Sequence, residues 1–456
     1  MSHQDPSSTS PQALQLRSLR IENIRGIESL DLESELPGPP GEGGWTLILG
    51  DNGVGKSTIL RSLALVLAPR DAAGALLQVL GPAAPFIHHG RDAASITAHF
   101  HNNAGKLHSE IHLNRGAEGR EQVGHGTAGG DRIYELPAVF AYGCQRGTAL
   151  GGPERDVDLG RPLDDLLSLF DPTAHLIHAE TWLRGLELGA LKENGGPREA
   201  FFDAVCRTLI GTLVGVDSLE IDKDGRVWLS GERIGRSTLA GLSDGYLTTA
   251  GWILDLIARW SHRRRRQGGE LDGDFASSMT GFVLIDEIDL HLHPFWQVRI
   301  VDDLRRIFPK LSFVATTHNP LSLLGARPGE IFVLSRDPSG LHCTQKDIPP
   351  GTRADQVLTG EWFGLPSTVD RETQGLIERH QAMLRDGVPR FDERRQQLEN
   401  EIRRRIGTFQ DTAVDRMVQS VAAEILPDDY PTKSHEERLA LREKVLALAK
   451  SRGAGA

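Results

Sequence analysis

The segment GDNGVGKST, residues 50–58, fits the pattern G-x-x-x-x-G-K-[ST]. It follows a short apolar run and opens a helical pattern, which is the context of a phosphate-binding loop. Gly53 and Gly55 allow successive backbone N–H groups to face a phosphate. Lys56 is placed to neutralise β- and γ-phosphates, and Ser57 to bind Mg²⁺. The predicted nucleotide-binding residues of this loop are Asn52, Gly53, Gly55, Lys56, Ser57 and Thr58.

Two carboxylates follow a second apolar run, in GFVLIDEIDLHLHP from Gly281 onward. This run predicts a buried strand that delivers Asp286 and Glu287 to its carboxyl end, where open α/β sheets bind ligands. Asp286 suits a Mg²⁺ ion, and Glu287 is placed to activate the water that attacks a γ-phosphate. A solvated acidic strand end is the alternative, and the upstream phosphate loop argues against it.

His318 ends a third apolar run, in FVATTHNP. A single histidine after a strand is more often structural than catalytic. Here the separation from Glu287 leaves room for one helix and a returning strand, which would set His318 beside the γ-phosphate as a hydrogen-bond donor. We therefore predict a catalytic role for His318.

A long helical pattern begins with the letters LSDGY, from Leu242 to Tyr246. Ser243 and Gly245 at a helix N-terminus offer a hydroxyl group and bare N–H groups to an anion. A simple helix cap is the competing interpretation.

Apolar periodicity predicts the elements that position these motifs. Two strands with a turn near Gly26 precede the phosphate loop, and further strands are expected around SITAHF, KLHSEIHL and PAVFAYG. The runs GFVLIDE and LSFVATTH flank a helical segment, as in a parallel sheet with crossover helices. Residues 161–214 and the chain beyond about 351 have helical patterns.

Together these motifs resemble the ABC-type ATPases of the SMC/RecF/OLD branch, in which two ATPase heads sandwich ATP. The resemblance covers roughly residues 14–336, including LRIENIRGIESLDL before the phosphate loop, and it implies ATP and Mg²⁺ as ligands. In that family a Leu-Ser-x-Gly-x signature opens a helix and completes the partner molecule's site. The resemblance therefore assigns Ser243 and Gly245 to a nucleotide held between two subunits of a homodimer or higher homo-oligomer.

Three further positions take their expected roles from the same resemblance. AYGCQRG resembles the segment that carries the family's Q-loop, which makes Gln145 a candidate ligand of Mg²⁺ and of the attacking water; Arg146 is the competing polar group. Asp289 matches a D-loop residue that faces the second subunit. His291 and His293 follow in the same segment and, without a third ligand beside them, are not expected to bind zinc.

The signature departs from the transporter pattern. Asp244 and Tyr246 replace the commoner Gly and Gln. A carboxylate near a γ-phosphate weakens anion binding unless it points away, so we expect the sandwich to be weak or to need a partner. The chain also lacks the long heptad arms of SMC proteins, which argues against long-range tethering of DNA.

A closer resemblance rests on LFDPTAHLIHAETWLRGLE, LSDGY, IDEIDLHLHP and LTGEWFGL. This combination looks like compact bacterial ATPases, some of which act in anti-phage defence; the Septu-type ATPase works with an HNH nuclease. It implies regulation of a separate effector protein, a nuclease or toxin.

The alternative is a RecF-like DNA repair or recombination ATPase that acts on DNA directly, with SHRRRR at 261–266 as a candidate contact. A transporter ATPase is a third and weaker alternative.

Composition sets broader bounds on the 456-residue chain. Its net charge of −11 argues against a surface that is basic throughout, although a local basic groove remains compatible with it. The three cysteines are widely spaced, which indicates reducing conditions. No signal peptide or membrane-spanning run is found, so we expect a cytoplasmic protein without membrane contact.

We predict an α/β P-loop NTPase fold of ABC/SMC head type, with a mixed sheet, a helical insertion and a helical C-terminal region. The expected divisions are a disordered tail at 1–13, an ATPase domain at 14–350 with its insertion at about 155–215, and a region at 351–456 for oligomer or partner contacts.

Overall fold

The computed structural model describes residues 13–34, 38–39, 41–81, 84–102, 105–116, 120–124, 137–146, 159–192, 196–365, 367–406, 441 and 444. The chain divides into two compact units, Met1–Gly364 and Leu365–Ala456. Nearly all of the expected tail, residues 1–12, lies outside the described ranges.

The central sheet of the first unit has the strand order β14-β13-β3-β12-β11-β7. Neighbouring strands are parallel, except that β13 and β14 form an antiparallel hairpin at one edge. The predicted mixed sheet, with parallel strands and crossovers, is thus confirmed. Its strands are β3 (Trp45–Gly50), β7 (Val139–Tyr142), β11 (Gly281–Ile285), β12 (Leu311–Thr316), β13 (Ile331–Asp337) and β14 (Gly340–Gln345).

Both faces of this sheet are covered, which explains why its inner strands are apolar without interruption. Leu47 and Leu49 of β3 belong to one hydrophobic core, whereas Ile48 between them belongs to the other. Along β11, Val283 and Leu284 divide in the same way. The strict alternation fixes the register, because a slip by one residue would exchange the two faces.

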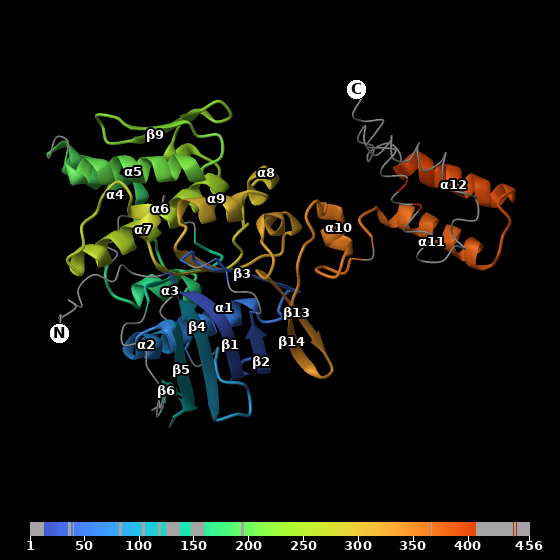
Figure 1. Cartoon of the computed structure of the whole chain (residues 1–456), viewed down its shortest axis with the longest axis horizontal. Coiled ribbons are helices and arrows are strands. Elements are labelled where there is room, and N and C mark those ends of the chain that lie inside the picture. Colours follow the sequence, from blue (N-terminus) through green and yellow to red (C-terminus); the bar gives the residue numbers. More distant parts are fainter. Residues whose placement is uncertain are drawn as a thin grey trace, which may run out of the picture. The chain divides into compact units, whose positions relative to one another are not determined.

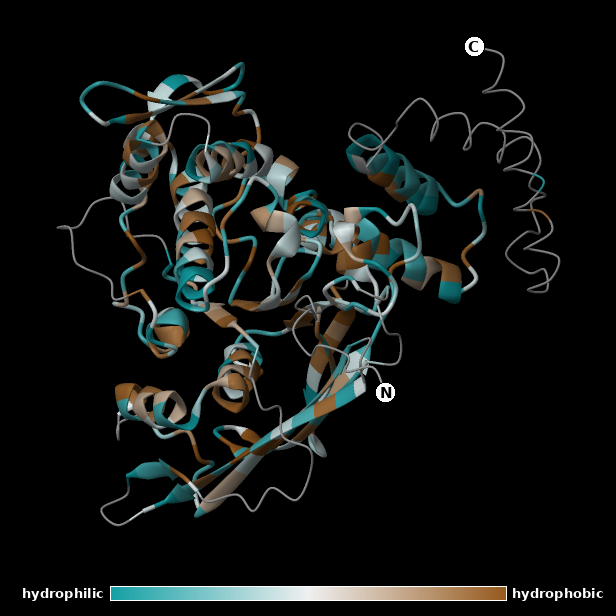
Figure 2. Ribbon diagram, turned by 60° about the vertical axis from the view of Figure 1, so that its left-hand side comes forward, coloured by the Kyte–Doolittle hydropathy of each residue, from teal (hydrophilic) through white to brown (hydrophobic). Residues whose placement is uncertain are grey.

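A second, antiparallel sheet packs on the side of Ile48, with helix α1 (Lys56–Leu67) between the two sheets (Figure 1). Its strand order is β2-β1-β4-β5-β6. Buried and exposed residues alternate along β1 and β4, because one face meets the core and the other meets solvent. Figure 2 shows this alternation of hydrophobic and hydrophilic residues along the long strands. The elements on this side are β1 (Gln15–Ile24), β2 (Ile27–Glu33), β4 (Ala93–Asn102), β5 (Gly105–Arg115), β6 (Glu121–Val123), α2 (Arg70–Leu80) and α3 (Asp164–Phe170).

Helices cover the opposite face of the central sheet. The longest, α6 (Asp244–Arg266), is buried at every residue from Thr248 to Ser261, as a helix surrounded by protein on all sides must be. An antiparallel hairpin that turns about Asp224 belongs to a small sheet with the order β10-β9-β8. The elements on this side are α4 (Ala179–Leu191), α5 (Pro197–Thr212), β8 (Ser218–Ile221), β9 (Val227–Gly231), β10 (Gly235–Thr238), α7 (Phe275–Ser278), α8 (Pro294–Gln297), α9 (Ile300–Ile307) and the short 3-10 helices Leu239–Gly241 and Pro320–Gly325.

The first unit extends beyond the expected end near residue 350. Helix α10 (Ala354–Thr359) places Val357 in the core with no exposed surface, and the unit continues to Gly364. The described part of the second unit contains α11 (Arg371–Arg385) and α12 (Glu393–Ile406). Across the described residues, no helix is both long and apolar enough to cross a membrane.

Candidate nucleotide-binding site

Four loops meet at one edge of the central sheet. Ile285 is in register with Tyr142 on one side and with Ala315 on the other, and Thr316 is in register with Ile48. The strands are parallel, so the segments that follow β3, β7, β11 and β12 all leave the sheet at its carboxyl edge. The phosphate loop, the acidic pair, His318 and the Gln145–Arg146 pair are therefore brought together, as parallel open sheets require.

The phosphate loop joins β3 to α1. Gly53 and Gly55 have φ angles of 78° and 122°, a region that favours glycine. The Lys56 side chain is buried, and its Nζ donates hydrogen bonds to the carbonyl oxygens of Gly50 at 2.7 Å and Asp51 at 2.9 Å. Burial lowers the pKa of Lys56, and the charges of Asp286, Glu287 and Asp51 act in the opposite direction. The lysine thus lies folded over its own loop.

Hydroxyl groups from two different elements bind the carboxylate of Asp286. Ser57 Oγ donates to Asp286 Oδ2 at 2.6 Å, and Thr316 Oγ1 donates to Asp286 Oδ1 at 2.6 Å. A hydroxyl and a carboxylate oxygen this close together are the kind of hard oxygen ligands that Mg²⁺ prefers. The residues present therefore fit a Mg²⁺ ion held by Ser57 and Asp286. Thr316 was not predicted; its signal was its place at the end of the apolar run that precedes His318.

Glu287 adopts a left-handed backbone conformation, with φ of 52°. Its N–H donates to Thr316 Oγ1 at 2.7 Å. Non-glycine residues with such φ angles are uncommon and concentrate at functional sites. The turn begins directly after the strand, and the side chain remains partly exposed.

Arg146 and Gln145 are neighbours with very different surroundings. The Gln145 side chain is exposed, and its role as a Mg²⁺ ligand stays a prediction. Arg146 is only 2% exposed and donates to the carbonyl oxygens of Gly143 at 3.2 Å, Glu287 at 2.7 Å and Asp286. Burial lowers the pKa of Arg146 to about 10, so the guanidinium is still charged at neutral pH.

His318 follows β12 and is exposed. Burial of part of the ring and the charge of Lys56 lower the pKa of His318 from its ordinary value, 6.5. The imidazole is therefore neutral at pH 7, with one N–H available as a donor.

The signature segment starts α6 as predicted. Ser243 occupies the position before the first helical residue, yet its exposed side chain makes no capping hydrogen bond, so the helix-cap alternative has no support here. Gly245 is buried, and a Cβ atom there would lie 2.4 Å from the carbonyl oxygen of His291. The start of α6 therefore packs directly against the loop that follows the acidic pair.

The loop after the acidic pair contains Asp289, which is predicted to face a second subunit, and His291 and His293, which are not expected to bind zinc. Asp289 Oδ1 is buried and has no hydrogen-bond partner within the described part of the chain. His293 Nδ1 accepts from the N–H of Phe295 at 3.3 Å and so caps α8. His291 has a left-handed φ of 65°. Over the described ranges, no group of three His, Cys, Asp or Glu residues is arranged to hold a metal ion.

Comparison with known proteins agrees with this geometry. Residues 149–324 match the family described as "AAA domain, putative AbiEii toxin, Type IV TA system", and residues 18–127 match a second "AAA domain" family. Septu protein PtuA of Bacillus mycoides (strain KBAB4) is 28% identical over 380 residues, which is 82% of this chain and 48% of that protein. The Septu protein PtuA of Bacillus thuringiensis is 26% identical over 331 residues, 71% of this chain and 76% of that one.

The chain is thus similar to AAA-domain proteins and to Septu protein PtuA. The retron Ec83 probable ATPase of Escherichia coli is 43% identical over a shorter stretch of 79 residues, 17% of this chain and 14% of that protein. Among solved structures, the SMC head domain from Thermotoga maritima covers 73% of this chain and 100% of its own, at 13% identity and a TM-score of 0.41. The chain spans about half the length of the Bacillus mycoides relative.

Proposed function

We propose that this protein binds and hydrolyses ATP with Mg²⁺. The observation that carries the proposal is the hydrogen-bonded series Ser57–Asp286–Thr316–Glu287, which links the phosphate loop, the acidic pair and the third strand end. The series joins three segments that are far apart in the sequence, and Ser57, Asp286 and Glu287 each match a part that ATP hydrolysis requires.

Each residue has a definite task in this chemistry. The N–H groups of the loop and Lys56 bind the phosphates. Ser57 and Asp286 hold Mg²⁺, which neutralises charge on the β- and γ-phosphates when bound. Glu287 orients the attacking water and takes its proton as the oxygen bonds to phosphorus and ADP leaves. The neutral His318 donates a hydrogen bond to the γ-phosphate.

We infer that two copies close head to head around ATP. The hydroxyl group of Ser243 is exposed and makes no capping bond to its own helix, and the Asp289 residue is partly exposed. Both groups are where the ABC-type resemblance expects contacts to a second subunit.

The biological output we propose is regulation of a separate effector, a nuclease or toxin, in cytoplasmic anti-phage defence. Similarity to Septu PtuA and to retron ATPases supports this output. A tagged pull-down with and without ATP tests it. A nuclease or toxin recovered in stoichiometric amount supports the effector; a lone ATPase stimulated by DNA indicates the RecF-like alternative.

Glu287→Gln tests the ATPase itself. Removing the proton acceptor should lower kcat by about 10²–10⁴-fold, while ATP still binds and the closed dimer accumulates. Lys56→Ala serves as the comparison, because it should lose nucleotide binding and dimer alike. Unchanged turnover in Glu287→Gln would mean that another residue is the base.

A further inference from the structure

Arg146 is a buried cation whose hydrogen bonds go to main-chain carbonyls. Buried charged groups are normally paired with an opposite charge, because removing an ion from water is costly. No side-chain carboxylate is bonded to this guanidinium among the described residues. Its two Nη atoms instead donate to the carbonyl oxygens of Gly143, Asp286 and Glu287.

The carbonyls of Asp286 and Glu287 belong to the turn at which β11 leaves the sheet. Asp286 N still bonds to Tyr142 O, and Ile288 N bonds to Thr316 O, at 2.9 and 3.0 Å. The residue between them, Glu287, has the left-handed φ of 52°. A left-handed non-glycine residue is strained and persists only where its surroundings hold it. Arg146 donates to the carbonyl oxygen of Asp286, which precedes Glu287, and to that of Glu287 itself. These two hydrogen bonds therefore hold the backbone on both sides of the Glu287 N–Cα bond.

We propose that Arg146 is a positioning residue of the ATPase site, which fixes the backbone turn at Glu287 and thereby sets the direction of the Glu287 carboxylate. The inference rests on the proposed ATPase function. Arg146 acts through Glu287 and does not itself contact the nucleotide.

The geometry calls for arginine and not only for positive charge. The two Nη atoms serve carbonyls that come from two different segments, the loop after β7 and the turn after β11. A lysine ammonium is a single point donor and cannot reproduce a planar fork. Arg146→Lys therefore keeps the charge and loses the geometry.

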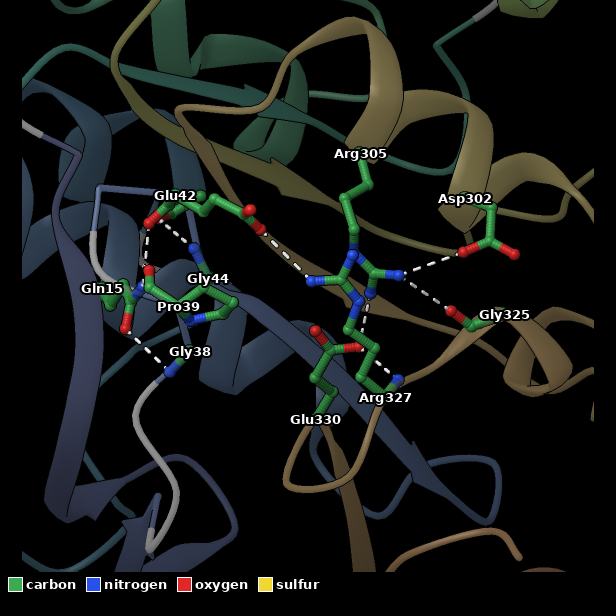
Figure 3. A network of polar contacts seen from close by, with 11 residues as sticks. Gln15, Gly38, Pro39, Glu42, Gly44, Asp302, Arg305, Gly325, Arg327 and Glu330 are labelled. Carbon is green, nitrogen blue, oxygen red and sulfur yellow. Dashed lines mark hydrogen bonds and ion pairs between the residues drawn. The ribbon is translucent and has the colours of Figure 1, made fainter. Parts of the chain in front are cut away.

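Arg305 on α9 provides a matched control. Its side chain is also largely buried, and it donates to the carbonyl oxygen of Gly325 at 3.2 Å and to Glu330 at 2.6 Å (Figure 3). Its guanidinium lies 5.7 Å from the ring of Trp45, the first residue of β3 and thus the end opposite the phosphate loop. Loss of this fork removes buried bonds without touching the candidate site.

The experiment compares Arg146→Lys, Arg146→Gln and Arg305→Lys with the wild-type chain. For each, kcat, ATP affinity and Tm are measured. Arg146→Lys and Arg146→Gln should lose at least about tenfold in kcat while ATP affinity stays within about threefold, since a positioning residue acts on the transition state more than on binding. Arg305→Lys should lower Tm and leave kcat unchanged.

Each other result has a clear meaning. If either folded Arg146 variant keeps wild-type kcat, or if kcat falls only as far as in Arg305→Lys, the positioning role is wrong. A loss of ATP affinity as large as the loss of kcat also overturns it, because the residue would then serve binding. A wild-type chain that binds ATP but never hydrolyses it overturns the proposed function instead.

Discussion

At the scale of single residues, the absence of a side chain at Gly245 determines how closely α6 packs against the loop after the acidic pair. Gly245 allows the start of α6 to lie against the backbone of His291, where a Cβ atom would come within 2.4 Å of the carbonyl oxygen. Backbone atoms cannot rotate away as a flexible side chain can. The glycine of the signature is therefore needed within its own chain, in addition to any contact with nucleotide.

Gly245→Ala should separate α6 from this loop. Overpacking of this kind costs about 1–3 kcal/mol, so we expect a lower Tm and weaker ATP-dependent closure. Gly251→Ala in the same helix is the control: its added Cβ would lie 4.0 Å from Leu176, and alanine favours a helix over glycine by about 0.5–1 kcal/mol. Thermal unfolding of both variants checks the pair. Equal stability of the two would show that the contact at His291 yields without cost.

At the scale of elements, a buried polar network joins α6 to the strand that precedes Gln145. Tyr142 donates to Asp255 at 3.0 Å, and Arg259 donates to Asp255 at 2.6 Å and to Asp165 of α3 at 3.2 Å. The N–H of Ile177 also donates to Asp255, at 3.0 Å. Burial and the nearby Asp255 carboxylate raise the pKa of Tyr142, so its hydroxyl remains a donor. The Asp255 carboxylate of α6 is thus bonded to β7 and to the segment before α4, and α3 joins the network through Arg259.

Asp255→Ala should destabilise the first unit strongly. It leaves the Arg259 charge short of one partner and removes the acceptor of Tyr142 and Ile177; breaking a buried pair in this way costs about 3–5 kcal/mol. Glu220→Ala removes an exposed pair with Arg236 and should cost less than about 1 kcal/mol. Denaturant unfolding measures both. If Asp255→Ala behaved like the surface variant, the network would contribute little to stability.

At the scale of the whole molecule, we propose that the nucleotide site is complete only when two chains meet. Ser243 is exposed at the start of α6, and the phosphate loop lies at the start of α1 in the same chain. A substitution at Ser243 should therefore affect closure of the dimer and spare binding of ATP to the monomer.

Ser243→Arg tests this separation. In a Glu287→Gln background, ATP should no longer drive dimerisation, because a long charged side chain blocks the sandwich, while ATP affinity of the monomer changes less than about threefold. Light scattering after size exclusion, combined with a nucleotide titration, measures both quantities. Loss of ATP binding by the monomer would place the signature in the same chain's site and would contradict the sandwich.

Much of the fold could be predicted from local pattern. WTLILG, GFVLI and LSFVAT read as buried strands, the loop after Gly50 as a phosphate site and LSDGY as a helix start, because each depends on residues that are neighbours in the chain. The tertiary structure alone decided the rest. Thr316 bridges Asp286 and Glu287, Arg146 is buried while Gln145 is exposed, Gly245 meets His291, and Val357 carries the first unit past residue 350. Those contacts depend on the register and packing of segments that are distant in sequence, which apolar periodicity does not specify.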